Sequence, residues 1–552
     1  MTQLTDARPP IGVGRAMSRP APLRPSADFG PTDRVRGWVV TIVLTALAAV
    51  TRLLNLNYPT DGGTPSFDEK YYAHQAWEMV TGGGVEDNPA YGVVVHPPVG
   101  KQMIALGELV FGYTPWGWRF SAAVFGIVLV LLVVRITRRM TRSTLLGAVA
   151  GLLLICDGTT FVSSRIGMLD IFQTVFAVAA FGCLIVDRDE VRARLARAAA
   201  EGRIPATGPV GRAANGLGSV TAGFREFGPR LGVRWWRFGA GVLLGLACGT
   251  KWSGLYFIAA FGLLSVCFDL AARRAYGVPR PWVGTAVRDI VPALYALVLI
   301  PVLVYLGSYG AWFASEDGYD RYSVGNQSAG KNPIGSGGFW AWIPDSLRSL
   351  WHNHGESLSF HESLTNSAGN HHDWESKPWS WPMGLRPMLY HYSDSAVGGC
   401  GESSCVKAVM LIGTPALWWL SIPMLAWAIW RCATRRDWRY AAVLVGYFGG
   451  FLPWFLNLDR QMYYFYAVPM APFLVMGLAL MLGEILGPAP FAHRAGGYRF
   501  LLSTERRNLN LLAVCLYLGL VVANFIWLWP ILTGLPITVG TWHNHLWLPS
   551  WS

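Results

Sequence analysis

The stretch Pro115-Trp-Gly-Trp-Arg-Phe-Ser-Ala-Ala-Val-Phe-Gly-Ile-Val-Leu-Val-Leu-Leu-Val-Val134 decides the fold class of this chain. Its one charged residue is Arg119, close to the start, and Arg135 follows directly at the end. A run of about 18 or more apolar residues is long enough to cross a bilayer as a helix. We therefore predict a membrane-spanning helix, with Arg119 at one surface and arginines at the other.

Similar apolar runs recur along the 552 residues, of which 52% are hydrophobic and only 14% are charged. A soluble protein of this size could not bury so much apolar surface, and the 26 tryptophans suit aromatic belts at membrane surfaces. We predict an all-α polytopic membrane protein. About eleven spans are expected, at residues 37–56, 115–134, 144–162, 168–186, 236–251, 253–270, 289–309, 408–430, 440–456, 463–484 and 509–530.

The net charge of +12 comes largely from arginines in alternate connections, such as 135–143 and 187–235. This alternation is typical of cytoplasmic loops under the positive-inside rule. It predicts a cytoplasmic N-terminus and, with an odd number of spans, an extracytoplasmic C-terminus. The basicity therefore reflects membrane topology, and we predict no nucleic-acid partner.

The connections divide the chain into four parts. We predict a disordered cytoplasmic tail at 1–35, a transmembrane module at 36–309, a large external loop at 310–407 and a C-terminal four-helix transmembrane module at 408–552. The first module includes an external loop at 57–114, with short helices around 68–81 and 98–112, and a flexible cytoplasmic insert at 187–235. Two large external loops over one opening favour an enzyme with an extracytoplasmic acceptor.

The most informative charges are the adjacent carboxylates Asp68 and Glu69, in Thr64-Pro-Ser-Phe-Asp-Glu-Lys-Tyr-Tyr72. Charge beside a bilayer is costly and usually functional. Cations that topology does not explain fall on the same side of the membrane: Arg119, Arg165, Lys251, Arg386 and Arg460. Sugar transfer from a lipid phosphate needs a base for the acceptor hydroxyl and cations for the leaving phosphate.

Each of these charges also has a structural interpretation. Arg119 and Arg165 suit interface anchors, Arg165 and Asp170 suit an ion pair, and carboxylates at a helix start are favoured by its dipole. The external loop adds six histidines: His352, His354, His361, His371, His372 and His391. Zinc is one interpretation, but no His-Glu-x-x-His spacing is present, so we favour an acceptor groove and predict no metal. For Cys400 and Cys405, a disulfide and two free thiols both remain open.

The order of several short motifs resembles the protein O-mannosyltransferases, polyprenyl-phosphate-mannose-dependent enzymes of the GT-C glycosyltransferase class. The similar stretches are Phe67-Asp-Glu-Lys-Tyr-Tyr72, His96-Pro-Pro-Val-Gly-Lys101, Gly117-Trp-Arg-Phe-Ser121, Ser164-Arg-Ile-Gly-Met-Leu-Asp170, Thr250-Lys-Trp-Ser-Gly254, Ser376-Lys-Pro-Trp-Ser-Trp-Pro382 and Arg460-Gln-Met-Tyr-Tyr-Phe-Tyr466. The external loop is too short for the MIR domain of eukaryotic members, so the resemblance is to the bacterial, MIR-less form.

The resemblance implies a GT-C fold and inverting transfer of mannose from polyprenyl-monophosphate mannose to Ser or Thr hydroxyls of secreted proteins. It implies a site on the outer face of the plasma membrane, with membrane lipids and the protein-export machinery as further partners. The expected roles are catalytic for Asp68 and Glu69, phosphate-binding for Arg119, Lys251, Arg386 and Arg165, and acceptor or pocket for His96, Lys101, Asp170, Trp379, Tyr390 and Tyr463. The alternatives are a GT-C transferase acting on a lipid or glycan and, from a different class, a transporter or lipid flippase.

Overall fold

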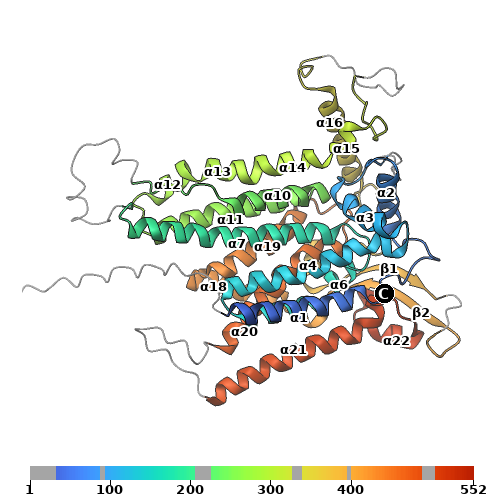
Figure 1. Ribbon diagram of the computed structural model, residues 1–552. Coiled ribbons are helices and arrows are strands. Elements are labelled where there is room, and N and C mark those ends of the chain that lie inside the picture. Colours follow the sequence, from blue (N-terminus) through green and yellow to red (C-terminus); the bar gives the residue numbers. More distant parts are fainter. Residues whose placement is uncertain (1–32, 87–93, 205–225, 326–337, 395–398, 488–503) are drawn as a thin grey trace, which may run out of the picture.

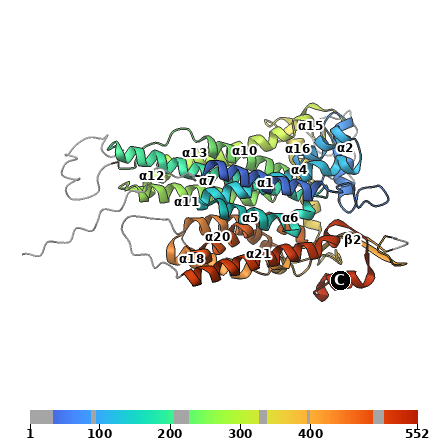
Figure 2. The same cartoon turned by 60° about the horizontal axis from the view of Figure 1, so that its bottom comes forward.

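A computed structural model describes residues 33–86, 94–204, 226–325, 338–394, 399–487 and 504–552 (Figure 1). The long helices run side by side as a bundle, and short helices, loops and strands gather at one of its ends (Figures 1 and 2). We call this the site end. Most of the predicted disordered tail, residues 1–32, lies outside the described residues.

The N-terminal half of the bundle carries the first external segment. Its helices are α1 (Arg34–Leu53), α2 (Glu69–Thr81), α3 (Val99–Phe111), α4 (Pro115–Thr141), α5 (Thr144–Ile155), α6 (Gly158–Ser163), α7 (Asp170–Ala200), α10 (Trp235–Thr250), α11 (Gly254–Ala275), α12 (Pro281–Arg288), α13 (Ile290–Leu294) and α14 (Ile300–Ser308). Helix α4 begins where the sequence indicates, because Thr114 accepts a hydrogen bond from the Gly117 amide and Pro115 suits the first turn. Helices α2 and α3 confirm the two short helices predicted in the first external segment.

The rest of the chain contributes α15 (Gly310–Ala314), α16 (Asp345–Ser363), α17 (Pro415–Trp418), α18 (Ser421–Arg435), α19 (Trp438–Phe451), α20 (Ala471–Leu486), α21 (Thr504–Thr533) and α22 (Val539–His545). Within the described residues, seven helical segments are long and apolar enough to span a membrane. Two of them form the core, since the best windows of Asp170–Ala200 and Tyr464–Leu486 are 78% and 89% buried. The polytopic α-helical fold class is therefore confirmed.

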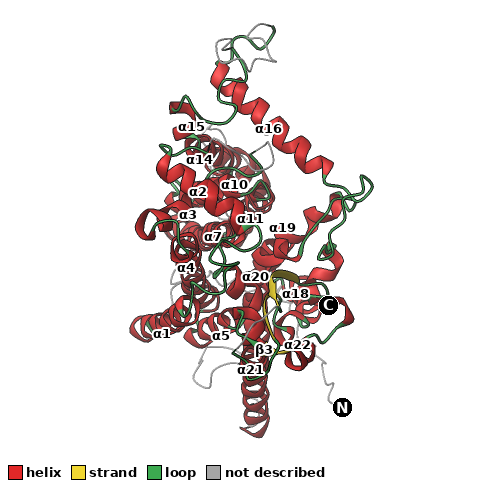
Figure 3. Ribbon diagram, turned by 90° about the vertical axis from the view of Figure 1, so that its right-hand side faces the viewer, coloured by secondary structure: helices red, strands yellow, loops and turns green. Residues whose placement is uncertain are grey.

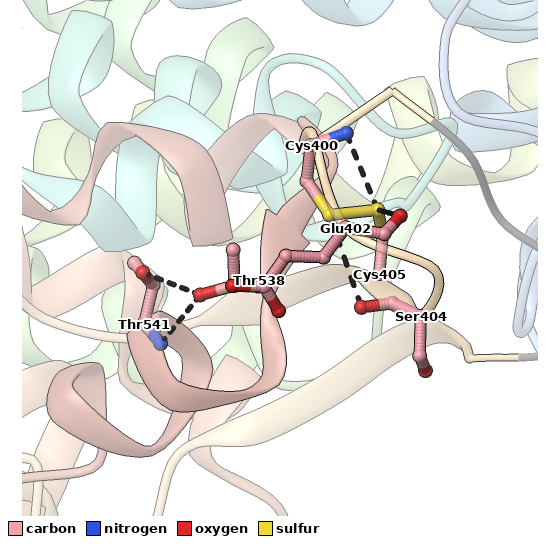
Figure 4. Close-up of a disulfide and its surroundings, with 6 residues drawn as sticks. All are labelled: Cys400, Glu402, Ser404, Cys405, Thr538 and Thr541. Carbon is pink, nitrogen blue, oxygen red and sulfur yellow. Dashed lines mark hydrogen bonds between the residues drawn. A yellow bond between two sulfur atoms is a disulfide. The ribbon is translucent and has the colours of Figure 1, made fainter.

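A small antiparallel sheet at the site end adds to the predicted all-α fold. Strand β2 (Cys405–Leu411) pairs with β1 (Met388–Ser393) on one side and with β3 (Ile537–Thr538) on the other. A disulfide between Cys400 and Cys405 closes the loop before β2, which settles the open choice for these two thiols (Figure 4). The sheet thus ties the external loop to the C-terminal segment.

Two predicted segments differ from the structure. The eighth span, predicted at 408–430, is wrong in its first part, because residues 405–411 form β2 and α18 begins only at Ser421. A short apolar run does not distinguish a buried central strand from a helix. The insert at 187–235 is not flexible at its start, since α7 continues to Ala200; residues 205–225 lie outside the described residues.

Candidate active site

The two adjacent carboxylates lie at the start of α2 but have different surroundings. Glu69 is fully buried and accepts two hydrogen bonds from Arg119, at 2.7 Å from Nε and 2.8 Å from Nη2. It also accepts from the backbone amides of Gly167 at 2.7 Å and Ser66 at 3.0 Å. These four donors occupy the carboxylate, so Glu69 and Arg119 hold the start of α2 against α4.

Asp68 is half-buried, and its side chain makes no hydrogen bond or ion pair with any residue that the structure describes. Burial raises the pKa of Asp68 from 3.8 to about 6, although the positive charges of Lys251 and Lys70 oppose the rise. A carboxylate with this pKa is largely ionised at neutral pH yet basic enough to take a proton. Asp68 therefore has the properties of a general base.

Lys251 lies between the end of α10 and the start of α11, close enough to lower the pKa of Asp68. Its Nζ is 2.8 and 2.9 Å from the two carboxylate oxygens of Asp170, the first residue of α7. It also lies 5.2 Å from the ring centre of Phe465. Asp170 thus fixes Lys251 beside Asp68, and the predicted acidic and basic groups do converge.

Four basic residues were predicted to bind phosphate. In two of them, Arg165 and Arg386, the guanidinium group donates its hydrogen bonds to backbone oxygens instead. Arg165 donates to the carbonyls of Arg52, Leu54 and Asn55 at 2.9, 2.7 and 3.0 Å, which satisfies the open end of α1. Arg386 donates to the backbone oxygens of Asp373, 13 residues earlier, and of Ser550 and Ser552, 164 and 166 residues later. Together with Arg119, which pairs with Glu69, these arginines hold the scaffold in the described structure.

Arg460, which we grouped from sequence with the other external cations without giving it a role, lies at the edge of the site. Its Nη2 donates to Nδ1 of His361 at 3.1 Å, and Nε of this guanidinium is buried without a hydrogen-bond partner among the described residues. Arginine cannot accept, so Nε2 of His361 carries the proton and donates to the Val95 carbonyl at 3.1 Å. No carboxylate in the described part of the chain forms an ion pair with Arg460.

His96 lies where these cations meet. Its ring centre is 5.6 Å from that of His361 and 5.9 Å from that of Tyr72. Burial lowers the pKa of His96 well below its usual value, and the charges of Lys251, Lys101 and Arg460 lower it further. Several positive charges therefore act on this half-buried position, which suits an anion better than an imidazolium.

The remaining predicted pocket residues spread outward from this centre. Tyr390 on β1 is buried against Phe67, with ring centres 4.9 Å apart, and its hydroxyl has no hydrogen-bond partner among the described residues. Burial, Asp170 and Asp68 raise the pKa of Tyr390 well above its usual value. Lys101 is buried in an ion pair with Glu86.

Tyr463 and Trp379 lie further toward the solvent. The Tyr463 ring stacks on Phe465 with 5.2 Å between centres. Burial raises the pKa of Tyr463, and Tyr466 and the charge of Asp68 add to the rise. Trp379 is 59% exposed. A small cavity opens beside Asp170 and Tyr466 and is also lined by Gln173, Tyr256 and Trp454. The site thus joins a buried charged centre to an aromatic rim.

No cluster of three metal-ligating side chains occurs among the residues that the structure describes. The arrangement offers instead one available carboxylate, two cations and polar aromatic residues at the end of a membrane-spanning bundle. Such a site can deprotonate a hydroxyl and stabilise a departing phosphate. These are the two requirements of glycosyl transfer from a lipid-linked donor.

The fold matches a solved glycosyltransferase. The structure titled "Structure of S. cerevisiae protein O-mannosyltransferase Pmt1-Pmt2 complex bound to the sugar donor" aligns with a TM-score of 0.64 at 15% identity, over 94% of this chain and 93% of that one. The chain therefore has the GT-C fold of polytopic membrane glycosyltransferases.

Sequence comparison defines the family. Residues 42–195 match the dolichyl-phosphate-mannose-protein mannosyltransferase family, and residues 346–551 match the C-terminal four TMM region of protein-O-mannosyltransferase. Proteins named polyprenol-phosphate-mannose--protein mannosyltransferase are 56% identical in Mycolicibacterium smegmatis strain MKD8 (100% of both chains), 57% in Mycobacterium tuberculosis strain CDC 1551 (99% of both) and 42% in Corynebacterium glutamicum (92% of both). This chain belongs to the protein O-mannosyltransferase family.

Proposed function

We propose that this chain transfers mannose from polyprenyl-phosphate mannose to a Ser or Thr hydroxyl of a secreted protein. Family membership supports the reaction class, and the names of the relatives support a polyprenol-phosphate-mannose donor and a protein acceptor. The single structural observation that carries the proposal is the half-buried Asp68 beside Lys251, without a hydrogen bond or ion pair to a described residue.

Asp68 acts as the general base in this proposal. The acceptor oxygen attacks C1 of mannose from the face opposite the phosphate, so the new C–O bond forms as the C1–O bond to phosphate breaks. The hydroxyl proton passes to Asp68, and the bonding electron pair leaves with the polyprenyl phosphate. One displacement of this kind inverts the anomeric centre.

Lys251 and Arg460 stabilise the leaving phosphate. Lys251 donates to both carboxylate oxygens of Asp170, which leaves one of its three ammonium protons for an anion. Arg460 has no carboxylate partner in the described structure and can turn its positive charge toward the same anion. We reassign Glu69 and Arg119 as positioning residues, because their mutual pairing occupies both. We also withdraw Arg165 and Arg386 as phosphate ligands, since backbone carbonyls surround their guanidinium groups.

We place the reaction on the extracytoplasmic face of the plasma membrane, where export delivers Ser/Thr-rich acceptors. The arginines at the end of α4, Arg135, Arg138 and Arg139, lie at the opposite end of the bundle from α2 (Figure 1). The positive-inside rule then supports a cytoplasmic location for that end. The proposal uses no resident metal, so transfer is expected to persist after chelation by EDTA.

The test combines the purified protein in lipid nanodiscs with labelled polyprenyl-phosphate mannose and a Ser/Thr-rich peptide. Mass spectrometry of the peptide is expected to show added hexose on a hydroxyl side chain. Label found only on a lipid or glycan acceptor would replace the protein acceptor with the alternative substrate class. Movement of a lipid across the bilayer without any transfer would favour a flippase and overturn the proposal.

A further inference from the structure

Helix α16 has its polar and apolar sides reversed relative to a helix that packs on a hydrophobic core. Its buried residues are Ser349, Leu350, Asn353 and Ser357, of which three are polar. On the opposite face, Leu347, Trp351 and Leu358 recur at spacings of four and seven residues and are 39%, 81% and 49% exposed. An apolar face of this kind needs a contact that the described chain does not supply.

Specific hydrogen bonds hold the polar face onto the protein. Nε2 of His354 lies 2.6 Å from the Tyr305 hydroxyl on α14, and the Ser357 hydroxyl donates to the Val94 carbonyl. His361, at the end of α16, bonds to Val95 and Arg460. The orientation of α16 is therefore fixed, and its apolar face points away from the bundle.

The segment that enters α16 extends the apolar surface. Phe339, Trp340 and Trp342 are 82%, 58% and 74% exposed, an unusual concentration of exposed aromatic side chains. We call Phe339, Trp340, Trp342, Leu347 and Trp351 the aromatic arm.

The arm lies beside the membrane-spanning surface. Viewed from the site end, α16 runs along one edge of the bundle, and its first turns project past α14 and α15 (Figure 3). The neighbouring span Ile290–Ser308 presents Leu299, Val302 and Leu303 at 47%, 48% and 53% exposure, as expected for a lipid-facing helix. Through the contact between His354 and the Tyr305 hydroxyl, α16 lies at the site end of this apolar span.

Charge distinguishes the type of surface that the arm fits. Helix α16 carries Asp345, Glu356 and Glu362 against Arg348 alone, and Arg348 lies 3.3 Å from Asp345. It therefore lacks the basic cluster that binds anionic headgroups. Tryptophan rings, in contrast, accumulate at the boundary between headgroups and acyl chains without a basic partner.

We propose that the aromatic arm inserts into the lipid surface of the bilayer at the site end. The lipid contact holds α16 across the bundle and, through His361, keeps Arg460 at the edge of the site. The arm is thus a membrane anchor for the external loop, separate from the spanning helices.

Photo-crosslinking in lipid nanodiscs tests this inference without requiring transfer activity. Benzoylphenylalanine replaces Trp351 in the full chain, and matched proteins carry it at Leu303 on α14 or at Tyr392 on β1, which is 45% exposed. Mass spectrometry then identifies what each position has captured. We expect lipid adducts at position 351 to exceed those at 392 at least about fivefold, because aromatic groups partition into the interface.

Molecules other than lipid that could cover the aromatic arm would give different crosslinked products. A crosslink from position 351 to an added acceptor peptide, or to a second copy of the chain, with no lipid adduct would overturn the inference. So would the absence of any adduct at 351 while position 303 captures lipid. Adduct yields that are unchanged between low and high salt would support apolar insertion, whereas loss of lipid adducts at high salt would contradict it.

A second measurement follows α16 itself. In nanodiscs, the variant Trp340→Ser/Trp342→Ser/Trp351→Ser is expected to exchange the amide hydrogens of residues 345–363 at least about threefold faster, because the helix loses an anchoring contact. Exchange in α10 serves as the internal reference and should not change. Equal exchange of α16 in the variant and the parent protein would contradict the anchor.

Discussion

The two ends of the bundle use buried charge differently. At the end remote from α2, Arg234 donates to both Asp187 and Asp269, at 2.9 and 2.8 Å, and Arg273 donates to both oxygens of Asp289. These carboxylates are buried and each has an arginine partner. In each of these pairs the carboxylate charge is neutralised by an arginine within the protein.

The site end mixes satisfied and unsatisfied charge. Glu69 has four hydrogen-bond donors, whereas Asp68, one residue earlier, has none from the described residues. Arg165 and Arg386 donate to backbone carbonyls, whereas the Arg460 guanidinium donates to a neutral imidazole and has no carboxylate partner among the described residues. The comparison teaches that available charge, and not buried charge in general, identifies the chemical groups. Four experiments test this distinction.

The largest expected effect is on Asp68. Asp68→Asn removes the base, and mannose transfer is expected to fall by about 10²–10⁴-fold, the range for loss of general base catalysis. The melting temperature should not fall, because the carboxylate has no partner to lose and its burial is unfavourable. Transfer to the peptide and thermal unfolding are measured on the same preparation. If Asp68→Asn kept the activity of the parent protein, Asp68 would not be the general base.

The matched change at the next residue should act on stability. Glu69→Gln leaves the Arg119 guanidinium buried without its counter-charge, which typically destabilises a protein by about 3–5 kcal/mol. We expect a clear fall in melting temperature in nanodiscs. If Glu69→Gln were as stable as Asp68→Asn, the two carboxylates would not differ in the way the structure indicates.

A smaller effect is expected at Arg460. Arg460→Gln should raise the KM for polyprenyl-phosphate mannose by about 10–100-fold, since hydrogen bonds to charged groups contribute about 1.5–3 kcal/mol. The melting temperature should change little. Arg165→Gln is the control: it loses the carbonyls of Leu54 and Asn55 and should lower stability more than it raises KM. The reverse pattern would assign the phosphate to Arg165.

The smallest effect is a pH dependence. Asp68 must be ionised to act as a base, so kcat/KM should rise with pH and level off above about 6. Stability should change in the opposite direction to activity. Because folding raises the pKa of Asp68 from 3.8 to about 6, the contribution of this group to the free energy of unfolding falls as pH rises through this range. Asp68→Asn should remove that stability term, and a pH profile with no limb near 6 would exclude Asp68 as the titrating base.

The sequence by itself determined the membrane-spanning class and the family. Apolar runs such as 115–134 are long enough to require a bilayer, and this follows from composition and length alone. The motif order likewise indicated the enzyme family, and α2 and α3 were predicted within about two residues, a normal boundary uncertainty. The apolar strand β2 was mistaken for part of a span, because it is buried on both faces like a helix core.

Only the tertiary structure separated Asp68 from Glu69 and Arg460 from Arg165. Each pair has the same chemistry in the sequence, and the difference depends on partners far along the chain: Arg119 for Glu69, and the end of α1 for Arg165. Hydrogen bonding and burial decide whether a charge is satisfied, and both depend on which distant segments the fold brings together.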